Sequence, residues 1–264
     1  VPSYLPANIL HDGVVTRSVR DTWAFHAEIE KNIPATEFPP IGDISESFPK
    51  NLKIAVLTEN CLGEDSSAEL VQATHDVARL CASLGHEVEM ISNPFYKKFD
   101  EDFWLLWAHF GFLIRYSVGK ELSSKFDHTQ LEQWPKYLIS RHWRNIHKVP
   151  VAFWRLRRFV SQYETFMQNF DILLTPTLGT TVPKLGFFGP EVSGQEHWER
   201  INDFLPFTKY QNISGAPAIT LPCGTDLKGL PIGIQLSSRL GEDRLLLKLS
   251  LQLEQNSNWK SLNK

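Results

Sequence analysis

The sequence predicts an α/β protein, in which short strands alternate with longer helices. Residues 53–58 form a compact apolar run typical of a buried strand, and the alternating segment 86–91 predicts a half-covered strand. A helical pattern lies between them, so the three segments predict a βαβ unit with parallel strands and a right-handed crossover. Residues 218–221 and 232–236 predict two further strands, paired across a turn that contains glycine, proline and aspartate.

The elements before the first strand follow from local signals. Residues 1–15 are interrupted by proline and are expected to be extended. Hydroxyl side chains in the segment 16–21, with an aspartate in the first turn, predict a helix over residues 18–31. Three prolines that follow this helix predict a loop before residue 53.

The helix of the βαβ unit has a predicted start and a predicted end. Ser66 and Glu69 have the spacing of a capping box, and Gly85 is placed to end the helix. The loop after residue 58 lacks the glycine spacing of a phosphate-binding loop, which argues against a nucleotide site there. Apolar residues recur along the helix at the 3.6-residue spacing: Leu70, Val71, Thr74, Val77, Ala78, Cys81 and Leu84.

Residues 94–170 hold most of the aromatic side chains of the chain and predict helices alone. Three helices are expected, over residues 101–119, 129–143 and 151–169. An apolar stripe on the last of them predicts a face buried in the core: Leu156, Phe159, Val160, Tyr163, Phe166, Met167 and Phe170.

The C-terminal third returns to strands. Residues 171–177 predict a buried strand that ends at Pro176, and residues 180–194 predict a loop. Short helices are expected over residues 196–203 and 206–213, before the paired strands. A terminal helix is expected to start at Glu242 and Asp243.

Composition excludes several classes of protein. The 264 residues carry a net charge of −3, which provides no general attraction to nucleic acid or to an anionic membrane. No apolar run approaches the roughly 20 residues of a membrane helix. Cys61, Cys81 and Cys223 have no metal-site or disulfide spacing and predict reduced thiols in a cytoplasmic protein. The segment at Val1 has neither an initiator methionine nor a leader pattern, so we expect the chain to be a piece of a longer protein.

No catalytic constellation is evident in the residues alone. The nine histidines include no pair at the i, i+4 spacing, so no metal site is predicted. The strained Gly-x-Ser-x-Gly turn of many serine hydrolases is missing from the sequence. Cys223 stands at a strand end, but without an adjacent histidine or lysine its thiol should keep a high pKa, which favours a buried small residue.

A strip of cations between Gln133 and Tyr163 has two interpretations. The segment contains no acid, and a solvated helix face is the favoured explanation. The functional alternative is a basic surface for an acidic substrate or an RNA backbone. Its members are Lys136, Arg141, Arg144, Lys148, Arg155, Arg157 and Arg158.

Four ordered segments resemble successive blocks of the amidase-signature family. Their order and spacing carry the resemblance, because each is weak by itself. They are residues 12–21 (DGVVTRSVRD), 170–177 (FDILLTPT), 208–224 (TKYQNISGAPAITLPCG) and 229–243, which begins GLPIGIQ. Residues 94–170 match no block and correspond to the variable part of the family.

The resemblance implies an amide-cleaving enzyme without a cofactor. Family members use a serine nucleophile, a serine in a cis peptide bond and a lysine, with backbone amides of a glycine-rich loop stabilising the oxyanion. These residues precede the block of residues 12–21 in the family and would lie before Val1. No Gly-Gly-Ser-Ser-Gly-Gly segment occurs in this sequence, so no catalytic residue is assigned to it.

The resemblance also implies a fold and a set of motif residues. The fold is a mixed sheet with helices on both faces, and residues 1–264 would be the C-terminal portion of a single domain with a helical insertion at 94–170. The strand at 171–177 is expected at the edge of the sheet. Asn212 is explained equally by a polar link to a loop and by a helix C-cap. The candidate pocket or motif residues are Arg17, Asp21, Thr177, Asn212, Gly215, Pro217, Gly233 and Gln235.

Three functional hypotheses follow. The favoured one is the C-terminal part of an amidase that acts on a small-molecule amide, with the N-terminal catalytic half of the same protein as its partner. The second is the amide-transferring subunit that acts on mischarged tRNA, and the third is a non-catalytic scaffold with the same half-fold. An isolated chain could also form a homodimer through an exposed sheet edge.

Overall fold

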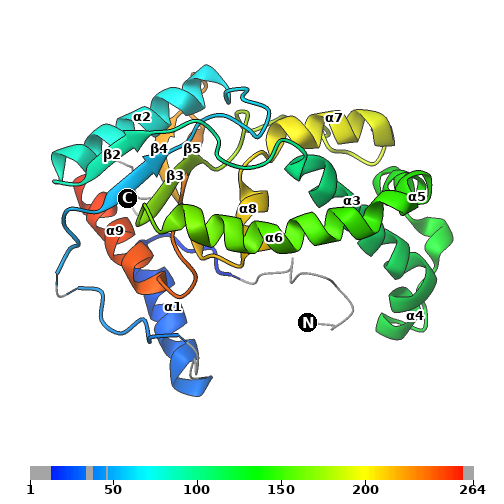
Figure 1. The fold of residues 1–264 in the computed structure, drawn as a ribbon, viewed down its shortest axis with the longest axis horizontal. Helices are drawn as coiled ribbons and strands as arrows, with labels where there is room; N and C mark the ends of the chain where they lie inside the picture. The colour runs from blue at the N-terminus through cyan, green and yellow to red at the C-terminus, as the bar shows by residue number, and fades with distance from the viewer. Residues whose placement is uncertain (1–12, 34–37, 46, 258–264) are drawn as a thin grey trace.

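The computed structural model describes residues 13–33, 38–45 and 47–257. Five strands form a mixed sheet, which confirms the predicted α/β class (Figure 1). In chain order the strands are β1 (Lys53–Val56), β2 (Glu87–Met90), β3 (Ile172–Pro176), β4 (Ala218–Thr225) and β5 (Pro231–Ser237). Their order across the sheet is β2-β1-β3-β5-β4. The expected extended segment at residues 1–15 lies almost wholly outside the described residues.

Helices cover both faces of this sheet. In chain order, the α-helices of the described residues are α1 (Val19–Asn32), α2 (Ala68–Ser83), α3 (Phe99–Leu113), α4 (Gly119–Leu122), α5 (Gln133–Asn145), α6 (Val149–Met167), α7 (Gly194–Phe204), α8 (Thr208–Ser214) and α9 (Asp243–Asn256). A π-helical turn (Ile114–Val118) joins α3 to α4, and 3₁₀ turns lie at His128–Gln130 and Ile146–Lys148. The predicted helices are present, with ends that differ by a few residues.

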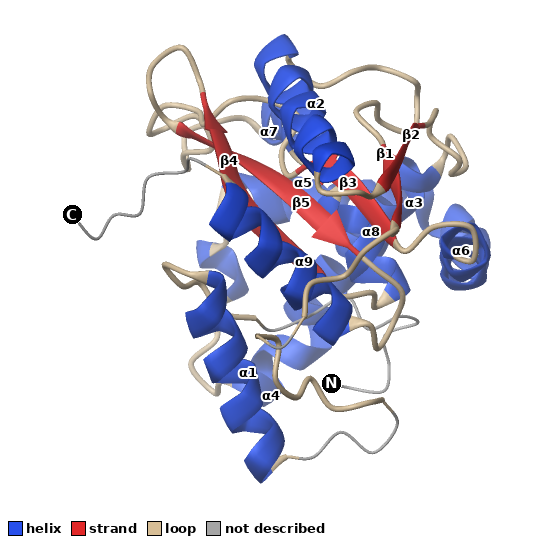
Figure 2. Cartoon of the chain, turned by 90° about the vertical axis from the view of Figure 1, so that its left-hand side faces the viewer, coloured by secondary structure: helices blue, strands red, loops and turns tan. Residues whose placement is uncertain are grey.

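Alternation along β1 explains the two layers. Ile54 and Val56 are fully buried in a core shared with α2 and α9, and α1 packs against α9 on this side (Figure 2). Ala55 and Leu57 are equally buried in a second core with α3, α6 and α8. Successive side chains of a strand point to opposite faces, so each face of the sheet has its own apolar cluster. The predicted helices on both faces are confirmed.

The βαβ unit has the predicted parallel pairing, from Lys53 opposite Glu87 to Val56 opposite Met90. Gly85 follows α2 with φ 91°, a left-handed conformation that glycine adopts at a helix end. The predicted capping box is wrong. The residue at the N-cap of α2 is Ser67 and not Ser66, and the Ser67 side chain makes no cap hydrogen bond. The carboxylate of Glu69 instead accepts the N–H of Leu227 at 2.9 Å.

The prediction for the strand at 171–177 was wrong in its position. β3 is the central strand, parallel to β1 on one side and antiparallel to β5 on the other. All five of its residues are buried, as its composition predicted. An edge position would leave its apolar side chains and one row of backbone groups open, and β4 occupies this edge instead.

The β4–β5 hairpin has the predicted antiparallel pairing. Asp226 organises its turn, because one carboxylate oxygen accepts the N–H groups of Lys228 and Leu230 at 2.9 and 2.8 Å. The register shifts between Pro222 and Thr225, where β4 is irregular. The long edge of β4 that faces away from β5 has no strand partner among the described residues.

Helices α3 to α6 extend beyond one end of the sheet (Figure 1). Two histidines are enclosed between them: His142 on α5 is 1% exposed, and its ring centroid lies 5.0 Å from that of His109 on α3. Burial lowers the pKa of both imidazoles, and for His142 the neighbouring His109 adds to this. The neutral forms of the rings are therefore favoured in the folded protein.

Acidification is expected to weaken this helical region. Because the folded pKa of His109 and His142 lies below the unfolded value of about 6.5, their stabilisation is complete above pH 6.5 and is lost as the pH falls through the folded pKa. Chemical denaturation at pH 7.5 and pH 5.5 should show a loss that His142→Phe reduces. A loss that His142→Phe leaves unchanged would contradict this explanation.

Candidate functional site

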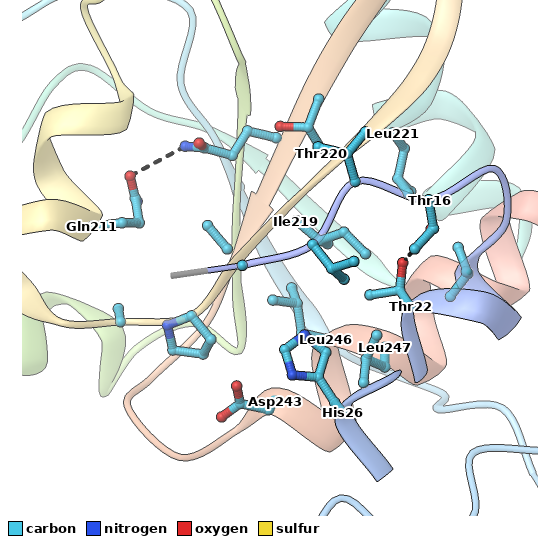
Figure 3. Close-up of a pocket in the computed structure, with 18 of the residues that line it drawn as sticks. Thr16, Thr22, His26, Gln211, Ile219, Thr220, Leu221, Asp243, Leu246 and Leu247 are labelled. Atoms are coloured by element: carbon cyan, nitrogen blue, oxygen red, sulfur yellow. Dashed lines mark hydrogen bonds between the residues drawn. The ribbon is translucent and has the colours of Figure 1, made fainter. Parts of the chain in front are cut away.

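A cavity of about 850 Å³ opens beside the free side of the β4–β5 hairpin (Figure 3). Its walls come from residues 13–19, α1, the loop that follows α1, the segment from α8 into β4, Gln235 of β5, and α9 with the turn before it. The lining combines apolar side chains such as Ile219 and Leu246 with polar ones such as Thr22 and Gln211. A few polar groups in a largely apolar cavity are typical of small-molecule sites.

Five of the eight predicted motif residues line this cavity: Arg17, Asn212, Gly215, Pro217 and Gln235. Gly215 ends α8 with φ 76°, and its N–H donates to the carbonyl of Gln211 at 2.8 Å. This left-handed turn leads the chain from α8 into β4 and places both on the same wall. Since α8 continues to Ser214, Asn212 lies inside the helix, so its explanation as a C-cap is wrong.

Thr177 and Gly233 lie directly behind the wall. The Oγ1 of Thr177 donates to the Oγ1 of Thr220 at 3.2 Å, and Thr220 lines the cavity. A methyl group at position 233 would lie 2.9 Å from Cγ2 of Thr220 and 3.1 Å from Oγ1 of Thr177. The glycine therefore allows Thr220 of β4 and Thr177, which follows β3, to lie close to the β5 backbone.

We expect Gly233→Ala to destabilise the protein by about 1–3 kcal/mol, the usual range for overpacking. The new methyl group would collide chiefly with Cγ2 of Thr220. Thr220→Ser removes that methyl group, so the double variant should recover part of the loss. Urea denaturation of the two single variants and the double variant measures this coupling, and a strictly additive result would contradict the steric explanation.

Asp21 lies apart from the cavity. It is in the first turn of α1, where its backbone N–H donates to the Oγ of Ser18 at 3.1 Å, and its carboxylate is exposed beside Arg20. The acid favours the N-terminal end of the helix electrostatically. Its position indicates a structural role at the helix start and no contact with a ligand in this cavity.

A buried polar network that the sequence analysis missed fixes one side of the wall. The Nε2 of Gln235 donates to Oε1 of Gln211 at 3.2 Å, a contact drawn in Figure 3, and Nε2 of Gln211 donates to the Oγ of Ser237 at 3.0 Å. The hydroxyl of Tyr163 donates to the same Oγ at 3.2 Å. Each amide has its orientation set by a buried partner, so this wall is preorganised. A polar glutamine inside the block 208–224 was the available signal for Gln211.

The charged groups of the cavity are few. Val19 donates its backbone N–H to Oε1 of Glu254 at 3.0 Å, which ties the start of α1 to α9. Figure 3 shows Asp243 and His26 on the same side of the cavity. Desolvation by the cavity walls raises the pKa of the Asp243 carboxyl, although much of the residue remains exposed.

The lining described here contains no lysine and no cysteine. Its serine, Ser18, accepts the N–H of Asp21 as a helix cap, which is a structural use of the hydroxyl. The chemistry that these described residues offer is hydrogen bonding, shape and a few charges. They form the wall of a binding site and contain no nucleophile paired with a base.

The other sequence candidates do not form a catalytic site among the described residues. Burial raises the pKa of the Cys223 thiol to about 12, which leaves it protonated and unreactive at neutral pH. No group of three or more potential metal ligands is found in residues 13–33, 38–45 and 47–257. None of the helices in this described part is long and apolar enough to span a bilayer.

The basic strip is divided by its contacts. Arg155 forms a bidentate ion pair with Asp102 of α3, at 2.5 and 2.6 Å. The guanidinium of Arg141 lies 3.7 Å from the ring centroid of Trp198, and that of Arg158 lies 4.8 Å from Trp154. Arg141 and Arg155 are half-buried and held by these partners. The other five cations, Lys136, Arg144, Lys148, Arg157 and Arg158, are exposed, as the solvated helix face predicts.

Comparison with known proteins identifies the class. The family model described as Amidase matches residues 4–247, so the chain belongs to the amidase family. A relative from Mycobacterium tuberculosis, named "Putative amidase AmiC", is 36% identical over 261 residues, which cover 98% of this chain and 55% of the relative.

Solved structures show the same fold. A 6-aminohexanoate cyclic dimer hydrolase superposes with a TM-score of 0.74 at 23% identity, over 92% of this chain and 54% of that protein. A bacterial aryl acylamidase of the amidase signature family gives a TM-score of 0.70 at 20% identity, over 98% and 55%. The chain spans about half the length of the curated relatives it matches.

Proposed function

We propose that this chain supplies the sheet strands and pocket wall of an enzyme that hydrolyses the C–N bond of a carboxylic amide, and that it is inactive alone. The observation that carries the proposal is the cavity beside β4, which joins motif residues from three segments of an amidase-family chain yet has no nucleophile–base pair in its described lining. The preorganised amides of Gln211 and Gln235 would orient a small-molecule amide there.

The N-terminal catalytic half of the same protein is the proposed partner. A preceding segment would bring the serine nucleophile, the second serine and the lysine to the open side of the cavity. The edge of β4 without a strand partner in the described residues provides backbone N–H and C=O groups for such a segment. The cysteines are free thiols, which supports the cytoplasm as the proposed compartment.

The experiment compares the chain with a longer product of its gene. The sequence upstream of Val1 is read first, and both proteins are then assayed for ammonia or amine release from alkyl and aryl amides. We expect turnover from the longer protein and background rates from the chain alone. Hydrolysis by the chain alone would refute the proposed division of labour. A longer protein that lacks an upstream lysine and a Gly/Ser-rich loop, and is inert toward all the amides, would favour the scaffold hypothesis.

The same samples test the homodimer. Sedimentation of the isolated chain shows whether the open edge of β4 pairs with a second copy. If dimers form in the isolated chain and disappear in the longer protein, the edge belongs to the preceding segment. Amide transfer to tRNA has weaker support, because Arg155 of the basic strip is held in an ion pair with Asp102.

A further inference from the structure

A second cavity, of about 610 Å³, lies among α3, α5 and α6. None of its lining residues lines the cavity beside β4. It takes in three members of the basic strip, Arg141, Lys148 and Arg155, and adds Lys98 from the start of α3. Lys98 thus lies in the same cavity as cations more than 40 positions further along the chain.

The charges in this cavity do not cancel. Arg155 is neutralised by Asp102, whose side chain is only 4% exposed and accepts two hydrogen bonds from the guanidinium. The remaining formal charges are those of Lys98, Arg141 and Lys148 against Glu101. Three cations around one carboxylate leave an excess of positive charge, which attracts an anion.

One of these cations is held in place. The guanidinium of Arg141 stacks 3.7 Å from the ring centroid of Trp198, and its Nη1 donates to the hydroxyl of Tyr137 at 3.3 Å. An arginine fixed by an aromatic ring loses little side-chain entropy when it binds a carboxylate or phosphate, and its remaining N–H groups can do so in a bidentate manner. Asn145 adds a neutral hydrogen-bonding group to the lining.

Besides these groups and His147, the lining is apolar. Leu105, Ala108, Val151 and Trp198 line the same cavity. Its volume is within the range of about 300–1,000 Å³ that small organic ligands occupy. An inorganic ion would leave most of this space empty, whereas an organic body that carries an anionic group matches both the charge and the walls.

We propose that this cavity binds a small organic anion, with its carboxylate or phosphate group on Arg141 and Lys148 and its apolar body against Leu105 and Val151. The site is independent of the proposed amide pocket, so it can exist whether or not the longer protein hydrolyses amides. Single-stranded RNA, the other ligand that a basic strip can attract, would contact cations outside the cavity as well.

Isothermal titration of the 264-residue chain with benzoate and phenyl phosphate tests the proposal at fixed ionic strength. We expect saturable binding of at least one of them, and the pair shows which head group is preferred. Arg141→Gln and Lys148→Gln should each weaken that binding about tenfold, the effect of a charge-assisted hydrogen bond. Benzyl alcohol, which has the ring without the charge, should bind far more weakly.

Lys136→Gln and Arg144→Gln are matched controls, because both cations are exposed on α5 and lie outside the cavity lining. They should leave the binding unchanged. If Arg141→Gln disturbs folding, the exposed pair Lys98→Gln and Lys148→Gln replaces it. Absence of saturable binding below about 10 mM, equal losses in the controls, equal affinity for benzyl alcohol, or preferential binding of polyuridylate that the controls weaken would each overturn the proposal.

Discussion

Asp100→Asn is expected to destabilise the protein by about 3–5 kcal/mol at pH 7, the range for removing one partner of a buried ion pair. Lys209 on α8 is 1% exposed, and its Nζ lies 2.8 Å from Oδ1 of Asp100 at the start of α3. The aromatic ring of Trp104, 5.6 Å from Nζ, cannot replace a carboxylate. Urea denaturation at pH 7 measures the change in unfolding free energy.

The loss should depend on pH with a definite sign. Burial lowers the pKa of Lys209, and Asp100 acts in the opposite direction. Without the carboxylate the folded pKa of the lysine falls further below the unfolded value of about 10.4. A depressed pKa means that stability is present above the unfolded value and is lost as the pH falls through the folded value. The deficit of Asp100→Asn should therefore shrink between pH 7 and pH 10.

Lys209→Met provides the control in the Asp100→Asn background. The double variant has no buried cation, so it should recover most of the stability lost by Asp100→Asn alone. A loss below about 1 kcal/mol for the single variant, or a double variant no more stable than the single one, would contradict a charged buried pair. The contact also matters for the site, because α8 presents Gln211 and Asn212 to the cavity from the same turns.

Local sequence patterns were sufficient to predict the helices and strands. The order of the strands in the sheet and the helix-cap contacts depend on residues far apart in the sequence. The βαβ unit and the hairpin follow from alternation and turn residues within short windows. The position of β3 depends on which strands pair with it, and β5 is some 60 residues away. The capping box failed for the same reason, since Glu69 binds the backbone of Leu227, 158 positions along the chain.

The cavity beside β4 was predictable only in part. Motif resemblance selected Arg17, Asn212 and Gln235, which the fold brings to one cavity, but it also selected Asp21, which serves the start of α1. The bonds among Gln211, Ser237 and Tyr163 join three elements and leave no trace in residue spacing. That the motif residues contact a substrate stays a prediction until a ligand is bound.

The aromatic centre of the second core carries the other large effect. Phe159 on α6 is fully buried, and its ring centroid lies 4.4 Å from Phe99, 4.9 Å from Phe95 and 5.8 Å from Tyr210. It therefore joins α6 to α3 and α8 above the sheet. Phe159→Ala removes these contacts and leaves a cavity, so we expect a loss of about 3–5 kcal/mol in the free energy of unfolding.

Two variants of the same helix calibrate this result. Phe159→Leu fills most of the space, so its loss in the free energy of unfolding should stay near the limit of about 1.5 kcal/mol for volume-conserving apolar changes. Trp154→Ala removes a larger aromatic ring that is 56% exposed and lies against the Arg158 guanidinium, so its loss should stay below about 1 kcal/mol. If Phe159→Ala and Trp154→Ala gave equal losses in denaturation, the burial of the α6 face that carries Phe159 would be refuted. A clearly larger loss for Phe159→Ala would support the stabilising role of the ring contacts from α6 to Phe99 on α3 and Tyr210 on α8.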